Sequence, residues 1–84
     1  MMNKVLVEIY VPKIEKSYDV FLPINITIYE AIKYIESSLS ELSNGYYIST
    51  DTARLSNRVN GFTYDLDKTI KDSKIYNSTK LVLI

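Results

Sequence analysis

The spacing of the apolar residues changes part-way along this chain, and that change limits the folds open to it. Between residues 5 and 22, apolar side chains recur at every second position in two runs, separated by a polar segment around Pro12. This alternation is typical of strands with one buried face, and two strands so close in sequence form an antiparallel hairpin. Pro23 ends the second run because proline cannot donate to the strand ladder. The residues expected to face the core are Val5, Val7, Ile9, Val11, Tyr18, Val20 and Leu22.

The next apolar residues follow a helical period. Their steps of four and three residues predict one face of an α-helix, formed by Ile28, Ile32, Ile35, Leu39 and Leu42. Thr27 and Glu30 have the spacing of a capping box, in which each side chain accepts a hydrogen bond from the other residue's amide. Asn44 and Gly45 tolerate the left-handed conformation that ends a helix. Off the apolar stripe, the residues expected to face water are Glu30, Lys33, Glu36 and Ser37.

The part of the chain that follows the helix contains several shorter elements. Tyr46–Thr50 is rich in β-forming residues and predicts a third strand, whereas the polar stretch 51–60 has no clear assignment. Asn60-Gly61 predicts a tight turn. The remaining expected elements are a short strand at Phe62–Tyr64, a helical turn capped by Thr69 with Asp72 reaching back, and a last strand at Lys80–Ile84.

One helix has to cover the apolar faces of all these strands. A single mixed sheet with the helix packed across one face meets that need, with the first and last strands parallel at the centre of the sheet. The helix then belongs to the long crossover that a parallel pair requires. At 84 residues the chain fits one domain, so the sequence predicts a single α+β domain over residues 1–84, with a four- to five-stranded sheet.

Several motifs resemble those of ubiquitin. Thr69–Ile75, followed by Ser78–Leu83, has the spacing of ubiquitin's Thr-Leu-x-Asp-x-x-Ile run and of its last strand, and Thr27-Ile28 is similar to the start of the ubiquitin helix. The resemblance implies a ubiquitin-like β-grasp fold. Ubiquitin and the β-grasp sulfur carriers act through a C-terminal Gly-Gly, whereas this sequence closes on Leu83-Ile84, which argues against a modifier or sulfur carrier.

The chain also resembles the YukD/EsaB family of small bacterial proteins that belong to type VII secretion systems. The segments that carry the resemblance are Tyr18–Val20, Ala31–Lys33 and Leu81–Ile84. It implies a non-enzymatic accessory or adaptor protein of such a system, acting in the cytoplasm by binding a protein such as a membrane-bound secretion component. A free-standing ubiquitin-like adaptor unrelated to secretion is the alternative.

The composition leaves little room for catalysis. Without histidine or cysteine, the chain has no thiol nucleophile, imidazole base or Cys/His zinc site. Its two glycines, Gly45 and Gly61, are too far apart for a phosphate-binding loop. Asp65 and Asp67 could hold a hard cation, although a solvated loop is the favoured interpretation. We therefore expect no catalytic residues, no metal site and no cofactor.

Charge and hydropathy restrict the partners. Ten basic and ten acidic residues give a formal net charge of zero, which opposes general binding to nucleic acids or anionic membranes. The lysines around the predicted helical turn are most simply a solvated face; they are Lys68, Lys71, Lys74 and Lys80. No apolar run approaches the roughly 20 residues of a membrane span, so direct membrane insertion is not expected.

The sheet face opposite the helix is the predicted partner-binding site. Alternation places five apolar residues there: Leu6, Tyr10, Phe21, Tyr47 and Val82. An exposed apolar cluster, here rimmed by Glu8, Asp19 and Lys80, is typical of a protein-binding surface, and a second copy of the chain is one form of partner. We expect Leu6 and Val82 to lie close together on the two central strands. The alternative is scattered surface side chains, or a cover formed by the stretch 51–60.

Overall fold

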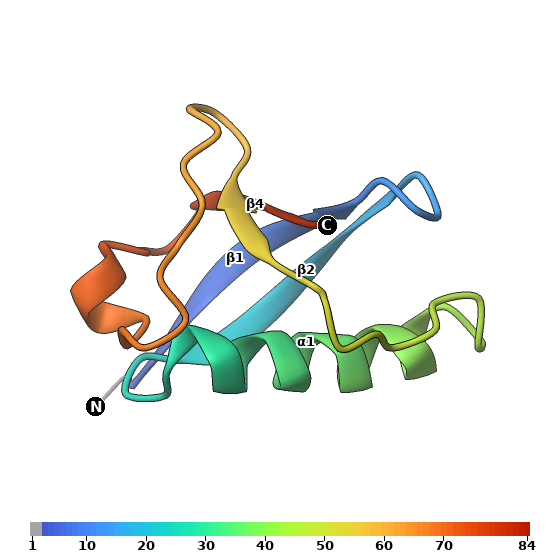
Figure 1. Ribbon diagram of the computed structural model, residues 1–84, viewed down its shortest axis with the longest axis horizontal. Coiled ribbons are helices and arrows are strands. Elements are labelled where there is room, and N and C mark those ends of the chain that lie inside the picture. Colours follow the sequence, from blue (N-terminus) through green and yellow to red (C-terminus); the bar gives the residue numbers. More distant parts are fainter. Residues whose placement is uncertain (1–2) are drawn as a thin grey trace.

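The computed structural model describes residues 3–84, so Met1 and Met2 lie outside the described residues. Its elements are β1 (Lys4–Val11), β2 (Lys16–Pro23), α1 (Ile28–Leu42), β3 (Leu55–Asn57), the short 3₁₀ helix η1 (Lys71–Ser73) and β4 (Lys80–Leu83). Figure 1 shows α1 running along one side of the sheet. A mixed four-stranded sheet with one helix confirms the predicted α+β architecture.

The strands form one sheet in the order β2-β1-β4-β3. β1 and β2 pair antiparallel along their full lengths, from Lys4 opposite Pro23 to Val11 opposite Lys16. The hairpin closes tightly because Glu15 takes a positive φ of 53° and its amide donates to the Pro12 carbonyl. β1 and β4 are parallel at the centre of the sheet, as the sequence predicts, and β3 adds antiparallel to the outer side of β4.

The core lies between the sheet and α1. The alternation predicted for the hairpin is confirmed: Val7, Ile9, Val11, Val20 and Leu22 are buried, and the half-buried Val5 and Tyr18 pack against this cluster. Leu81 and Leu83 of β4 continue the buried face. Ile70 and Ile75, on either side of η1, close one end of the core. No helix of residues 3–84 has the length and apolar character needed to cross a membrane.

Both ends of α1 have the local chemistry that the sequence predicts. Thr27 Oγ1 accepts a hydrogen bond from the Glu30 amide at 3.1 Å, and Glu30 Oε1 accepts one from the Thr27 amide at 2.9 Å, which completes the capping box. At the other end Asn44 and Gly45 adopt φ values of 54° and 84°. The Gly45 amide donates to the Ser40 carbonyl, so the helix ends in a left-handed turn.

Two helix positions differ from the prediction. Glu36, expected to face water, is 1% exposed, and Leu42, expected in the core, is 56% exposed. The reason is the path of the chain after the helix. The segment 47–50 returns along the Glu36 side of α1 and bonds to it, whereas Leu42 in the last turn is left facing solvent.

The prediction of a strand at Tyr46–Thr50 is wrong. The amides of Tyr47 and Thr50 bond to the side chains of Ser43 and Glu36, at 2.9 Å each, rather than to a neighbouring strand. The third strand is instead β3, inside the stretch 51–60 that had no assignment.

Three smaller predictions follow β3 along the chain. The turn at Asn60-Gly61 is confirmed, with Gly61 at φ 75° and its amide donating to the Asn57 carbonyl. The predicted strand at Phe62–Tyr64 is reduced to one bridge, between Thr63 and Ser56. Half of the predicted cap of the short helical turn is present: Thr69 Oγ1 accepts from the Asp72 amide at 3.1 Å, but within residues 3–84 the Asp72 side chain does not bond back to the Thr69 amide.

Candidate functional site

One apolar patch is exposed on the outer sheet face, meaning the face turned away from α1. Leu6 of β1 lies directly opposite Phe21 of β2 in the antiparallel register. Their side chains are 37% and 47% exposed, respectively. We call this pair the Leu6–Phe21 patch. It lies next to the free edge of β2 and holds two of the five predicted site residues.

Tyr10 and Val82 form a second patch on the same face. They are register partners in the parallel pair of β1 and β4, and both are half-buried. Arg58 accounts for part of this burial, because its guanidinium lies 4.4 Å from the centroid of the Tyr10 ring. The same guanidinium is 3.8 Å from Glu8 Oε1. A residue of the stretch 51–60 thus covers the Tyr10 ring, which agrees in part with the alternative that this stretch covers the face.

A row of charges separates the two patches. Glu8 lies between Asp19 of β2 and Lys80 of β4, and all three side chains are on the outer sheet face. The expected proximity of Leu6 and Val82 is therefore wrong. In the parallel register Leu6 meets Ser78, whose amide donates to the Leu6 carbonyl at 2.7 Å.

The Leu6–Phe21 patch borders a shallow hollow of about 260 Å³. Its outer-face lining combines one apolar side chain with charged and hydroxyl groups: Leu6, Glu8, Asp19, Ser78 and Lys80. Asn77 Oδ1 accepts a 2.8 Å hydrogen bond from the Leu6 amide and holds the backbone at this end of β1. An apolar anchor beside charges of both signs can bind the apolar and polar groups of a protein surface.

Tyr47 does not belong to this face. Its side chain is 3% exposed, on the helix side of the molecule, and its hydroxyl donates a 2.7 Å hydrogen bond to Glu36 Oε2. Burial raises the pKa of the Tyr47 hydroxyl well above its usual value, and both the hydrogen bond to Glu36 and the negative charge of Glu36 raise it further. Lys13 lies over the ring, with Nζ 5.7 Å from its centroid. Tyr47 is therefore a structural residue.

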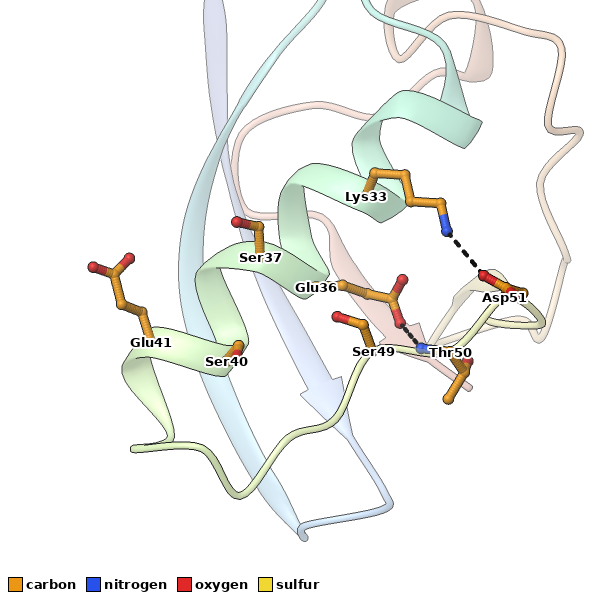
Figure 2. A pocket seen from close by; sticks show the side chains of 8 residues that line it. All are labelled: Lys33, Glu36, Ser37, Ser40, Glu41, Ser49, Thr50 and Asp51. Carbon is orange, nitrogen blue, oxygen red and sulfur yellow. Dashed lines mark hydrogen bonds and ion pairs between the residues drawn. The ribbon is translucent and has the colours of Figure 1, made fainter.

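A polar depression lies next to Glu36, and sequence reasoning missed it. Figure 2 shows side chains from α1 and from the segment 49–51 around it. The depression has a volume of about 620 Å³ and is lined by Lys33, Glu36, Ser37, Ser40, Glu41, Ser49, Thr50 and Asp51. Its position depends on where the segment after α1 crosses the helix, and no local pattern in the sequence encodes that crossing.

The acidic and basic residues considered as other candidate sites do not form a site in the part of the chain that the structure describes. Asp65 and Asp67 are both exposed, and no three metal-ligating side chains gather among residues 3–84. The four lysines considered around the short helical turn, Lys68, Lys71, Lys74 and Lys80, are also exposed. Their exposure agrees with a solvated face.

Comparison with known proteins places this geometry in one fold. No protein-family model matches the sequence, and no curated protein matches it. Solved structures do match. The ubiquitin-like domain of the Mycobacterium tuberculosis type VII secretion protein ECCD1 has a TM-score of 0.75 at 17% identity, with 99% of each chain covered.

Two further solved structures come from larger assemblies. A chain of the MycP5-free ESX-5 inner membrane complex has a TM-score of 0.71 at 18% identity; the match covers 99% of this chain and 21% of that one. A chain of the toluene 4-monooxygenase HD complex has a TM-score of 0.77 at 12% identity, with 95% of each chain covered. At these identities the likeness concerns the fold. The chain has the ubiquitin-like β-grasp fold, as its resemblance to ubiquitin implies.

Proposed function

We propose that this protein is a non-enzymatic accessory or adaptor protein of a bacterial type VII secretion system and acts in the cytoplasm by binding another protein. The observation that carries the proposal is the end-to-end match to the ECCD1 ubiquitin-like domain. That match agrees with the independent resemblance of Tyr18–Val20 and Leu81–Ile84 to the YukD/EsaB family. The match to a chain of an inner membrane complex adds support for a membrane-bound partner.

The Leu6–Phe21 patch is the surface that we assign to the partner. Phe21 is on an edge strand and is 47% exposed, so a partner can reach it from the face and from the side. Glu8, Asp19 and Lys80 beside it supply charges that select among partners more than they add affinity. The Tyr10–Val82 patch is the weaker candidate because Arg58 already packs on the Tyr10 ring.

A crosslinking pull-down from cells of the source organism tests both parts. The wild-type protein is compared with Phe21→Asp, which places a charge at the centre of the patch. Val59→Asp is the matched control, because Val59 is 82% exposed in the turn after β3 and lies outside the patch. Circular dichroism establishes that both variants are folded. We expect the wild type and Val59→Asp to capture a membrane-bound type VII secretion component and Phe21→Asp to lose it.

The other outcomes separate the two claims. Capture of the same component by all three proteins would leave the assignment to secretion intact and contradict the site. If no secretion component is captured by any of them, the secretion assignment fails, and a free-standing ubiquitin-like adaptor becomes the better description. A second copy of this chain captured through Phe21 would make the patch a dimer interface.

A further inference from the structure

The polar depression of Figure 2 has a buried carboxylate at its base. Glu36 is 1% exposed, whereas Ser37, Ser40 and Glu41, which line the same depression from α1, are exposed. Figure 2 shows the Glu36 carboxylate pointing from α1 toward the segment 49–51, with one oxygen on the Thr50 amide and the other turned away from it. The exposed side chains therefore form the rim, and Glu36 forms the base.

One oxygen of this carboxylate accepts no hydrogen bond from the described residues. Oε2 accepts from the Tyr47 hydroxyl at 2.7 Å and from the Thr50 amide at 2.9 Å. Oε1 is buried, and no group of residues 3–84 donates to it. Leaving a buried acceptor unpaired costs about 1–3 kcal/mol, and more when it is charged, so native proteins rarely leave such a group without a partner.

The rim adds further negative charge. Glu41 and Asp51 contribute carboxylates, and among the described lining residues Lys33 is the one cation. Lys33 Nζ is 3.9 Å from Asp51 Oδ1, in an exposed ion pair of the kind that contributes little. Ser37, Ser40 and Ser49 bring hydroxyl oxygens that can accept hydrogen bonds. The depression thus presents hydrogen-bond acceptors and more carboxylates than cations.

A guanidinium group has the chemistry that this lining accepts. It is always positively charged and carries five N–H donors in a planar fork, so it can bond to a carboxylate and to neighbouring hydroxyls at once. A metal ion fits less well, because no three metal-ligating side chains gather among residues 3–84. Because Oε1 is buried, the group can reach it only when side chains at the rim turn aside; Ser37 and Ser49 are short, exposed residues of that rim.

We propose that this depression binds the guanidinium group of an arginine side chain on a partner protein, with Glu36 Oε1 as its principal acceptor. The depression is built on α1 and the segment 49–51, and α1 covers the sheet face opposite the Leu6–Phe21 patch. It is therefore a second binding site, beyond the proposed function, and it holds whether or not the sheet-face partner belongs to a secretion system.

Nuclear magnetic resonance of the ¹⁵N-labelled protein tests the proposal. The probes are the capped peptide acetyl-Gly-Arg-Gly-amide and its citrulline analogue, which has nearly the same shape and no charge. We expect the arginine peptide to shift the amide resonance of Thr50, which donates to the same carboxylate, and the citrulline peptide to bind at least tenfold more weakly. Equal binding of the two peptides, or no shift at Thr50, would overturn the proposal. Free arginine binding tenfold tighter than the peptide would contradict a protein partner.

Variants connect the binding to Glu36. Glu36→Gln removes the charge but keeps an oxygen that can accept from Tyr47 and Thr50. It should weaken the binding of the arginine peptide at least tenfold. Glu15→Gln, in the exposed turn between β1 and β2, is the matched control and should bind like the wild type. Unchanged binding in Glu36→Gln would exclude the site.

A second variant keeps the proposal testable if Glu36→Gln does not fold. Ser40 is exposed and lies four residues after Glu36 on α1, the spacing and order that favour a Glu–Arg pair on a helix. Ser40→Arg should therefore place a guanidinium at Glu36 from within the chain and abolish peptide binding. A Ser40→Arg protein that still binds the peptide as tightly as the wild type would contradict the proposal.

Discussion

The hydroxyl of Tyr47 donates a 2.7 Å hydrogen bond to Oε2 of Glu36, and both side chains are almost completely buried. This bond joins the segment after α1 to the middle of the helix, across a sequence separation of 11 residues. The Thr50 amide donates to the same oxygen, so two donors from one irregular segment converge on one carboxylate. The segment is thereby held against α1 without forming a strand.

Tyr47→Phe should destabilise the protein. It removes one of the two donors to a buried carboxylate and keeps the ring, and hydrogen bonds to charged groups contribute about 1.5–3 kcal/mol. The free energy of unfolding, measured by urea titration, should fall by that amount. Tyr46→Phe is the control, because Tyr46 is 81% exposed and its change should stay within about 0.5 kcal/mol. Equal effects of the two substitutions would show that the buried bond contributes nothing.

The raised pKa of Tyr47 predicts a loss of stability at high pH. The folded protein keeps the Tyr47 proton at pH values where the unfolded chain, with a tyrosine pKa of about 10, releases it. This contribution is complete below about pH 10 and declines above it, by up to about 1.4 kcal/mol for each pH unit. The difference in unfolding free energy between wild type and Tyr47→Phe should therefore shrink from pH 9 to pH 11. A difference that stays constant over that range would contradict the prediction.

Two leucines of one helical stripe should respond very differently to truncation. Leu39 is fully buried, and Leu39→Ala should lower the free energy of unfolding by about 2–5 kcal/mol, because it removes apolar contacts and leaves a cavity. Leu42 is 56% exposed, so Leu42→Ala should change it by less than about 0.5 kcal/mol. Thermal and urea unfolding of both variants measure this. A large loss in Leu42→Ala would mean that the last turn of α1 is covered.

Arg58 and Tyr10 should show a measurable coupling. The guanidinium lies 4.4 Å from the ring centroid, and contacts of this kind contribute about 0.5–1 kcal/mol at exposed sites. A double-mutant cycle with Arg58→Ala and Tyr10→Leu should return that coupling energy. Repeating the cycle with Arg58→Ala and Glu8→Gln should give a smaller value that falls with added salt, because this ion pair is partly exposed. Strictly additive effects of Arg58→Ala and Tyr10→Leu would show that Arg58 does not pack on the sheet.

Much of the composition of the outer sheet face could be predicted, because strand alternation assigns each side chain to a face. Leu6, Tyr10, Phe21 and Val82 are on the outer sheet face, as alternation requires. Alternation does not give the offset between two parallel strands that are far apart in the sequence. That offset places Val82 beside Tyr10 and puts the charges of Glu8 and Lys80 between the two patches.

The sequence by itself determined the elements whose causes are local. The hairpin follows from alternation around Pro12, the start of α1 from the Thr27–Glu30 capping box, and its end from Asn44 and Gly45. These features depend on residues within a few positions of one another, so their spacing in the chain is sufficient to predict them.

Only the tertiary structure decided which side chains are buried or in contact where segments distant in the sequence meet. In that structure Glu36 is buried, Tyr47 bonds to the helix instead of lying on the expected sheet face, and Arg58 lies over the Tyr10 ring. A side chain next to the apolar stripe of a helix is exposed or buried according to which segment crosses it. That crossing is set by the packing of the whole chain, because burial of apolar surface and pairing of buried polar groups must be satisfied together.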